Sequence, residues 1–517
     1  ASIFASNIGS EHLIGLAGAG ASSGMAMAHW EIQGWMILIL GWVFVPFYTR
    51  SMVYTMPEFL ERRYNPQSRT ILSVISLVSY VLTKVAVTVY AGGLVFQQVF
   101  GIKELWGIDF FWIAAIGLVV LTALYTIFGG MKSVLYTSVH QTPILLLGSL
   151  IILVLGFKEL GGWDEMMRVC GAVTVNDYGD TMTNLIRSND DANFPWLGAL
   201  IGSAIIGFWY WCTDQFIVQR VLSGKNEMEA RRGTIFGAYL KLLPVFLFLI
   251  PGMIAFALHQ KYIGAGGEGF LPMLANGTAN ADAAFPTLVA KLLPAGVKGL
   301  VVCGILAALM SSLASLFNSS AMLFTIDFYK RFKPETPEKK LVGIGQIATI
   351  VIVVLGILWI PIMRSVGDVL YTYLQDVQSV LAPGIAAAFL LGICWKRTSA
   401  QGGMWGLISG MVIGLTRLGA KVYYSNAGEV ADSTFKYLFY DMNWLFFCGW
   451  MFLFCIIVVI VVSLATEAPT AEKIQGLVFG TATKEQKAAT RASWNHWDII
   501  HTVIILAITA AFYWYFW

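Results

Sequence analysis

Charged residues are scarce in this chain. Aspartate, glutamate, lysine and arginine make up 12% of its 517 residues, whereas soluble domains carry about a quarter. The formal net charge is only +3, and the lysines and arginines form no dense basic block. This charge distribution excludes an extended nucleic-acid-binding surface, so we expect no nucleic-acid partner.

Cysteines and catalytic motifs are also few. The six cysteines form no CxxC pair, and all but Cys170 lie in apolar segments, so neither a disulfide framework nor a cysteine metal site is indicated. The chain has no HExxH, GxSxG or Walker A motif, and its closest histidines, His496 and His501, lie five residues apart. We therefore expect no enzyme. Membrane enzymes with dispersed sites carry no such motif and stay an alternative.

Hydrophobic residues, in contrast, make up 57% of the chain, and the mean hydropathy is +0.71. Many uncharged runs are long enough to cross about 30 Å of hydrocarbon as helices. These features predict an all-α, polytopic membrane protein in a lipid bilayer. The thirteen predicted helical segments lie near residues 5–28, 33–49, 70–100, 109–128, 133–156, 195–219, 234–258, 285–329, 341–363, 368–395, 401–420, 443–465 and 498–517. Because 285–329 is too long for one span, we expect a short helix followed by one that starts near Gly304.

Lysine and arginine are unevenly distributed between alternate loops. One set of loops contains 20 of them and the other set 11. Because positively charged loops stay on the cytoplasmic side, the poorer set, which includes the acidic loop 164–191, is predicted to lie outside. We therefore expect a multi-pass protein of the cell membrane, plasma or inner, with its C-terminus outside.

The first predicted segment opens with ASIFASNIGSEH, which is polar after only about six membrane-compatible residues. A helix cannot begin in the middle of a bilayer without partners for its backbone. We therefore expect an N-terminal extension that completes it and adds up to one more span; the alternative is that this segment is tucked inside the helix bundle. Gly9 is where the helix hydrogen bonds can open and leave the carbonyls of Ala5 and Ile8 to face a cation. The small-residue face that follows, with Gly20 and Gly24, indicates close helix packing instead.

A second polar cluster lies in MSSLASLFNSS, residues 310–320. Its polar side chains share one helical face: Ser311, Ser312, Ser315, Asn318 and Ser319. A hard cation prefers several oxygen ligands, which hydroxyls and the unwound carbonyls of another helix can supply. Sodium fits this description. The alternative is a serine-lined packing seam between helices.

A third group of polar and aromatic residues is spread over several predicted helices. Its members are His12, Glu31, Lys241 and Gln375, with Trp30, Tyr210, Trp211 and Tyr371 as aromatic neighbours. Ionisable residues within membrane helices are costly and are usually functional. Mixed donors and acceptors beside aromatic faces suit the hydroxyls and the apolar face of a sugar. Spacing alone does not show that they converge, and Glu31 and Lys241 could equally form a buried structural ion pair.

Several stretches of the sequence are distinctive. They are FASNIGSEHLIGLAGAGASSG (4–24), TMPEFLERRYN (55–65), FWYWCTDQFIVQRVLSGKN (208–226), GAYLKLLPVF (237–246), SSLASLFNSSAMLFTIDFYK (311–330) and the LQ of YLQDV (373–377). Together they resemble the sodium/glucose cotransporter branch of the solute:sodium symporter family. The resemblance covers essentially the whole chain, and WYWCTDQ and SSLASLFNSS are its most specific parts.

The resemblance implies a transporter fold built on an inverted repeat of five plus five helices. This core would span residues 1–395, with the chain beginning inside the family's second helix, and residues 396–517 would form additional C-terminal helices. The co-transported ion would be sodium. Its implied ligands are the carbonyls of Ala5, Ile8 and Ala308 and the hydroxyls of Ser311 and Ser312.

For the sugar, the resemblance implies a set of contacts and gates around a site in the middle of the membrane. The implied contacts are Asn7, His12, Glu31, Lys241, Gln375, Tyr210 and Trp211. Tyr210 would also be the inner gate that stacks on the sugar ring. The implied outer lid consists of Leu16, Trp30 and Tyr371.

Two departures from the family pattern concern the cargo and the stoichiometry. Gly34 and Gly207 stand where some bacterial members place polar sugar contacts, so the identity of the sugar stays open. The resemblance implies that members that couple two sodium ions have an aspartate where this chain has Ser138 and a hydroxyl where it has Ala314. The loss of these two ligands predicts one sodium ion per sugar.

The expected function is sodium-coupled symport of a sugar such as glucose or galactose by alternating access. One alternative keeps the symport and changes the solute to an inositol, an organic acid or an amino acid. A less favoured alternative is a membrane sensor that binds without transport, for which the chain offers no appended signalling domain. The sequence does not define the oligomeric state.

Overall fold

The computed structural model describes the chain except residues 1–3, 5–6, 10, 275–276, 367–369 and 427–430, and for residues 125, 127–142 and 362–366 it describes the backbone alone. Most described residues are helical, which confirms the predicted all-α class. The strands within this described part are β1 (Glu104–Leu105) and β2 (Ile108–Asp109), an antiparallel pair.

The α-helices differ greatly in length. In chain order they are α2 (Ala17–Ser23), α3 (Ala28–Glu31), α4 (Gly34–Ile39), α5 (Val45–Ser51), α6 (Met56–Arg63), α7 (Pro66–Ser79), α8 (Ala86–Phe100), α9 (Phe110–Leu160), α10 (Trp163–Gly171), α11 (Trp196–Phe208), α12 (Gln215–Leu222), α13 (Glu227–Lys241), α14 (Ile250–Gly264), α15 (Ala284–Leu292), α16 (Ala295–Met322), α17 (Lys330–Phe332), α18 (Glu338–Val366), α19 (Leu370–Cys394), α20 (Ala400–Asn426), α21 (Thr434–Lys436), α22 (Trp444–Ala465), α23 (Ala471–Ile474), α24 (Lys484–Ala492) and α25 (His496–Tyr515).

Shorter segments of altered helical pitch lie between them. The π-helical ones are η1 (Glu11–Leu16), η3 (Leu40–Phe44), η4 (Tyr80–Val85), η5 (Trp209–Thr213), η6 (Val245–Leu249), η8 (Leu323–Tyr329) and η9 (Tyr437–Asp441), and the 3₁₀ segments are η2 (Gly24–Met27) and η7 (Ala281–Ala283).

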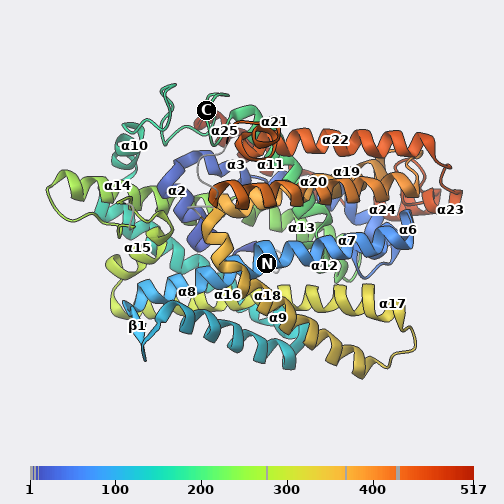
Figure 1. Ribbon diagram of the computed structural model, residues 1–517, viewed down its shortest axis with the longest axis horizontal. Helices are drawn as coiled ribbons and strands as arrows, with labels where there is room; N and C mark the ends of the chain where they lie inside the picture. Colours follow the sequence, from blue (N-terminus) through green and yellow to red (C-terminus); the bar gives the residue numbers. More distant parts are fainter. Residues whose placement is uncertain (1–3, 5–6, 10, 275–276, 367–369, 427–430) are drawn as a thin grey trace.

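The helices run side by side along the longest axis of the molecule (Figure 1). Ten helical runs among the described residues are long and apolar enough to cross a membrane. The outward side of α22 is apolar, with Leu453, Phe454, Ile457, Val461 and Leu464 exposed. Contiguous exposed apolar surface on long helices suits lipid rather than water. The predicted multi-pass membrane protein is therefore confirmed.

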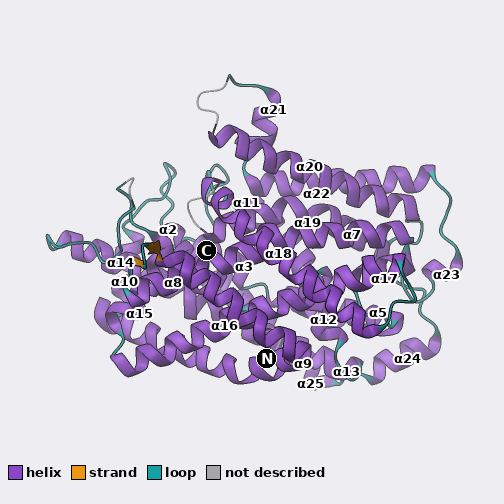
Figure 2. Cartoon of the chain, turned by 60° about the horizontal axis from the view of Figure 1, so that its bottom comes forward, coloured by secondary structure: helices purple, strands orange, loops and turns teal. Residues whose placement is uncertain are grey.

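The ten runs do not coincide with the thirteen predicted segments. Residues 5–28 and 33–49 contribute to a single run, Glu11–Ser51, and 109–128 is represented by a shorter apolar helix, Phe110–Leu124. The helix predicted at 401–420 is present as the glycine-rich α20 but is not among the ten. It packs against α19 and α22 in one layered group (Figure 2).

Two predicted boundaries are wrong. The predicted break between 128 and 133 is absent, because α9 continues from Phe110 to Leu160 across Gly129 and Gly130. Glycine lowers helix stability by only about 1 kcal/mol, so packing can override it. The short helix expected before the serine-rich one is confirmed as α15, but α16 begins at Ala295, directly after Pro294, rather than near Gly304.

Basic and acidic loops lie at opposite ends of the long axis. The elements α17, α23 and α24, which carry lysines of the basic set, lie at one end, and α10 lies at the other (Figure 1). The last helix, α25, returns to the acidic end. There the backbone N–H of Leu185 donates to the carbonyl of Phe516 at 3.1 Å, and the rings of Trp163 and Phe516 lie 6.2 Å apart.

The beginning of the chain divides into an interrupted part and a closely packed part. Regular helix is lost at Ile8 and Gly9 and resumes at η1, which agrees with the predicted opening at Gly9. Further along, Gly20 lies directly on the carbonyl of Leu249, and there is no room for a side chain between them. The small-residue face therefore forms a close helix contact, as expected.

Candidate functional site

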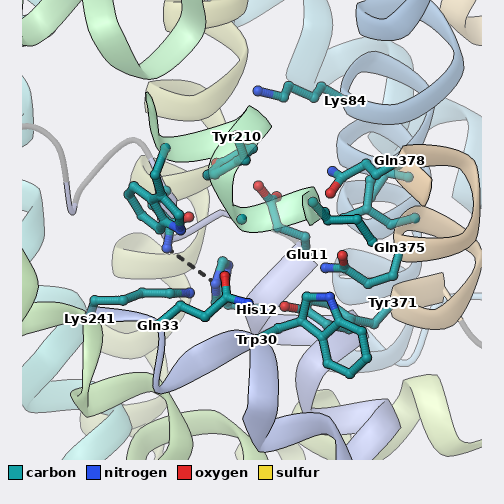
Figure 3. Close-up of a pocket in the computed structure, with 16 residues that line it drawn as sticks. Glu11, His12, Trp30, Gln33, Lys84, Tyr210, Lys241, Tyr371, Gln375 and Gln378 are labelled. Atoms are coloured by element: carbon teal, nitrogen blue, oxygen red, sulfur yellow. Dashed lines mark hydrogen bonds between the residues drawn. The ribbon is translucent and has the colours of Figure 1, made fainter. Parts of the chain in front are cut away.

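A buried cavity lies among the interrupted helices (Figure 3). Its volume is about 40 Å³, which leaves room for only a few water molecules. The lining residues are Asn7, Glu11, His12, Trp30, Gln33, Lys84, Val87, Ile206, Gly207, Tyr210, Trp211, Lys241, Tyr371, Leu374, Gln375 and Gln378. All residues predicted as sugar contacts or gates are among them except Glu31 and Leu16. The structure thus brings together side chains from segments hundreds of residues apart.

Altered helical turns carry much of this lining. His12 lies in η1, Lys84 in η4, and Tyr210 and Trp211 in η5. A π-helical turn holds an extra residue that disrupts the regular hydrogen-bond ladder, and such turns are frequent at functional sites. Lys241 ends α13 just before Pro244, which has no backbone N–H to continue the helix.

Glu31 lies behind the cavity and connects three of its lining residues. The Nζ of Lys241 donates to Oε2 of Glu31 at 2.6 Å, and Nε2 of His12 lies 3.3 Å from the same oxygen. The hydroxyl of Tyr371 donates to Oε1 at 2.6 Å, and Nδ2 of Asn7 lies 3.3 Å from Nε2 of His12. The ion pair that was the alternative to a site therefore exists. A buried charge is costly without its partner, so the ion pair stays formed. It therefore also holds in place the side chains around Glu31 that face the cavity.

A second buried ion pair supports another part of the lining. The Nζ of Lys84 lies 2.7 Å from Oδ2 of Asp214. The same ammonium lies 4.7 Å from the ring centre of Tyr210 and 3.7 Å from that of Phe216. Attraction between a cation and aromatic faces strengthens when both are removed from water. Lys84 therefore holds the predicted inner gate residue from one side.

Several buried polar atoms that belong to cavity residues have no hydrogen-bond partner among the described residues. They are Nδ1 of His12, Nε1 of Trp30 and Oε1 of Gln375. A buried polar atom without a partner costs about 1–3 kcal/mol. Nε1 of Trp30 is a donor, Oε1 of Gln375 is an acceptor, and Nδ1 of His12 is either, depending on the tautomer. A ligand with several hydroxyl groups can satisfy all three.

The two segments predicted to hold sodium also meet. A Cβ placed on Gly9 would lie 2.5 Å from Oγ of Ser312, so the interruption beside Ile8 abuts the serine-rich helix. The Oγ of Ser312 is buried and has no hydrogen-bond partner among the described residues. Ala308 and Ser311 are buried on the same helix. Ala5, the remaining predicted ligand, lies outside the described residues.

No carboxylate-rich metal centre is found in the part of the chain that the structure describes. No three His, Cys, Asp or Glu side chains in that part come together as ligands. Carbonyls and hydroxyls, as at Ile8 and Ser312, suit a monovalent hard cation better than a transition metal.

Two of the three predicted lid residues, Trp30 and Tyr371, line the cavity. Trp30 stacks on Trp444 of α22, with ring centres 5.5 Å apart and an angle of 22°. Tyr371 packs closely against Gly15, where a Cβ would lie 3.0 Å from that of Tyr371. Leu16 is fully buried but does not line the cavity.

Four polar lining residues are not among the predicted contacts and gates: Glu11, Gln33, Lys84 and Gln378. Gln378 follows Gln375 by three residues and shares its helical face, which was a usable signal. Gln33 donates from Nε2 to the carbonyl of Ser203 at 2.8 Å, and its Oε1 occupies the space that a side chain at Gly207 would need. Some family members have a polar side chain at the position that corresponds to Gly207. In this chain the side chain of Gln33 supplies polar atoms in that space.

Comparisons with known proteins agree with this geometry. The sequence profile described as the sodium:solute symporter family matches residues 1–410. Sodium/myo-inositol cotransporter 2 of Homo sapiens is 36% identical over 494 residues, which cover 93% of this chain and 72% of the human protein. Sodium/glucose cotransporter 1 of Ovis aries is 38% identical over 485 residues, which cover 90% of this chain and 72% of the sheep protein.

A solved structure shares the fold. It is the substrate-bound outward-open state of a Na⁺-coupled sialic acid symporter, with a TM-score of 0.68 at 21% identity, over 91% of this chain and 89% of that one. This likeness confirms the predicted transporter fold. The chain therefore belongs to the sodium:solute symporter family: it is a membrane transporter, not an enzyme, and it moves a solute together with sodium.

Proposed function

We propose that the solute is a neutral polyhydroxyl molecule, a hexose such as glucose or galactose, carried with one sodium ion by alternating access. The observation that carries this proposal is the set of unpartnered polar atoms on His12, Trp30 and Gln375 around one cavity. The side chains of Tyr210 and Trp211 add apolar faces beside them. Donors and acceptors next to aromatic rings suit a sugar ring, which is polar at its rim and apolar on its face.

The charges around the cavity favour a neutral solute. Lys241 is paired with Glu31 at 2.6 Å, and Lys84 with Asp214 at 2.7 Å. An organic acid or an amino acid would need cationic groups to hold its carboxylate, and both lysines already have carboxylate partners. We therefore place these solutes behind sugars and polyols.

Direct contacts to the solute are assigned to Asn7, His12, Lys241, Gln375 and the two aromatic residues Tyr210 and Trp211. Glu31 acts on the solute through His12 and Lys241, since it does not line the cavity in this conformation. Because the cavity is small, the solute enters when the lid side chains Leu16, Trp30 and Tyr371 move. Displacement of Tyr210 on the other side releases the solute inward.

The proposed sodium ligands are the carbonyls of Ile8 and Ala308 and the hydroxyls of Ser311 and Ser312, together with the carbonyl of Ala5. The contact between Gly9 and Ser312 supports this assignment. A stoichiometry of one is supported by Ala314, which is buried and offers no hydroxyl. One sodium ion crossing 100 mV contributes about 2.3 kcal/mol, and a tenfold gradient adds about 1.4 kcal/mol. This suffices for several-hundred-fold accumulation of solute.

We further propose that residues 1–395 form the transport core and that the chain lies in the cell membrane with its C-terminus outside. The arrangement of the loops supports this orientation. Phe516, the residue before the C-terminal Trp517, contacts the segment that carries the acidic loop, and the lysine-rich elements lie at the opposite end. The basic end is the cytoplasmic one.

Myo-inositol is the second candidate solute. The specific observation in its favour is the 36% identity to sodium/myo-inositol cotransporter 2 of Homo sapiens. Inositol is also a neutral six-membered ring with hydroxyls, so the same polar atoms can bind it. Hexose and cyclic polyol differ in the ring oxygen and in the number of hydroxyls, which the cavity does not distinguish.

The test is uptake into proteoliposomes that contain the purified chain. Labelled glucose is offered with an inward sodium gradient, with and without an excess of galactose, myo-inositol, an amino acid or an organic acid. We expect sodium-dependent uptake that a hexose or a cyclic polyol competes. Competition by the amino acid or the organic acid alone, or uptake that is equal in potassium, would contradict the proposal.

A further inference from the structure

The carboxylate of Glu11 lies at the junction of the solute cavity and the proposed sodium site. Glu11 is among the residues that line the cavity (Figure 3). A Cβ placed on Gly9 would lie 2.7 Å from Oε2 of Glu11 and 2.5 Å from Oγ of Ser312. The carboxylate oxygen and the serine hydroxyl therefore flank the same point in space.

The hydroxyl of Ser312 points to a ligand at this junction. Its residue is 5% exposed, and its Oγ has no hydrogen-bond partner among the described residues. Hard cations bind carboxylate and hydroxyl oxygens at about 2.3–2.6 Å, a reach that both groups have toward one intervening ion. Because the backbone at Ile8 and Gly9 is interrupted, carbonyl oxygens lie beside them.

We propose that Glu11 binds the coupled sodium ion together with Ser312. Its carboxylate thereby links the ion to the wall of the solute cavity. The neighbouring residue, His12, faces the solute, so fixing Glu11 on the ion shapes the cavity where the solute binds. This gives sodium a physical route to raise the affinity for solute, as coupling between two sites requires. The inference rests on the proposed sodium site and adds a charged ligand to it.

The test compares Glu11→Gln, which keeps the shape and removes the charge, with wild type in two assays. The first is the sodium dependence of solute uptake. The second is the shift in thermal unfolding that sodium causes relative to potassium without solute. Loss of a charged ligand should raise the half-saturating sodium concentration about 10-fold or more and shrink the thermal shift. Because the proposal makes Glu11 the link between the two sites, sodium should also lower the solute KM less in this variant than in wild type.

Two further variants make the outcome unambiguous. Glu268→Gln, on an exposed loop, is the matched control and should behave as wild type. Ser312→Ala tests the proposed sodium site itself. If wild type shows no sodium-dependent shift, or Ser312→Ala keeps it, the sodium site is wrong. If both behave as proposed and Glu11→Gln retains the wild-type sodium dependence, only the role of Glu11 is overturned.

Glu11→Asp covers the case in which the glutamine variant does not fold. The shorter carboxylate keeps its charge but reaches less far, so the half-saturating sodium concentration should rise about 5-fold. Sodium dependence equal to wild type in this variant would also overturn the proposal.

Discussion

Lys84 and Asp214 form a buried ion pair across the break in the helix that carries Tyr210. Asp214 separates η5 from α12, and its Oδ2 lies 2.7 Å from Nζ of Lys84 in η4. The other carboxylate oxygen accepts a hydrogen bond from the hydroxyl of Tyr80 at 2.8 Å. The broken helix is thus attached to η4 at the point where the proposed inner gate must move.

Removal of either member of this pair should impair both folding and transport. Asp214→Asn and Lys84→Met each leave a buried charge without its partner, which costs about 3–5 kcal/mol. We expect a lower midpoint of thermal unfolding and a loss of sodium-driven uptake in both variants. The double variant should recover part of the stability, because it leaves no unpaired charge.

The matched control for this prediction is Asp432→Asn. Asp432 pairs with Lys436 at 2.8 Å, but its side chain is 94% exposed. An exposed pair contributes little, so this variant should unfold and transport as wild type does. Equal stability of Asp214→Asn and Asp432→Asn would show that the buried pair does not hold the gate helix.

Ser312→Ala should severely weaken sodium-dependent uptake, because it deletes a proposed ligand. We expect the half-saturating sodium concentration to rise about 10-fold or more. The control is Ser320→Ala on the same helix, since Ser320 is also buried and its hydroxyl also has no partner among the described residues. The measurement is the half-saturating sodium concentration for uptake, determined by sodium titration of both variants. A similar response of the two serines would mean that the hydroxyl at 312 has no special role.

Gly9→Ala should weaken sodium binding without removing any ligand. The added methyl group would collide with Oγ of Ser312 at 2.5 Å, so the serine-rich helix must shift. Gly343→Ala in α18 is the control, because no atom lies within 4 Å of its added Cβ. That variant should be unchanged or more stable by up to about 1 kcal/mol. Thermal unfolding in sodium and in potassium measures both effects, and unaltered sodium stabilisation of Gly9→Ala would contradict the proposed site.

Asp282 should make the stability of the protein depend on pH. Burial raises the pKa of the Asp282 carboxyl from 3.8 to about 7, although its oxygens accept a hydrogen bond from the backbone N–H of Leu370. Because the folded state binds this proton more tightly than the unfolded state, the protonated carboxyl favours folding. This contribution to the free energy of unfolding is full below about pH 4 and is lost as the pH rises through about 7. The midpoint of thermal unfolding should therefore fall over this range.

Asp282→Asn should remove this part of the pH dependence, since the amide cannot ionise and its oxygen can still accept from Leu370. Unfolding midpoints measured from pH 5 to 8 for the variant, for wild type and for Asp190→Asn in an exposed loop check this. Parallel curves for all three proteins would refute the role of Asp282.

The sequence was sufficient to predict the fold class and the juxtaposition of two distant segments. An interrupted, glycine-containing start near Ile8 and a hydroxyl-lined helix at Ser312 each have a physical cost in a membrane, and that cost indicated a shared ligand. Eight of the predicted contacts and gates do line one cavity. Each polar residue or helix interruption within an apolar run is visible in the sequence by itself, so its cost in a membrane can be recognised without the structure.

Pairing in space was harder to predict. Lys84 gave the same signal as Lys241, a cation in an apolar run, but no local feature of the sequence marks Asp214, 130 residues away, as its partner. Likewise, the part that Gln33 plays at Gly207 depends on how two helices cross, which no spacing in the sequence contains. The break predicted within α9 was wrong because packing outweighs the weak preference of glycine for a break.

The stacking of Trp30 on Trp444 carries a consequence for the role of the C-terminal helices. Any widening of the entrance above the cavity has to part these two indoles, which lie 5.5 Å apart. Trp444 stands at the start of α22, beyond the residues assigned to the transport core. A helix that moves no ion and touches no cargo can therefore set how readily the entrance opens, and grafting α22 from a relative should change the speed of loading rather than the choice of cargo.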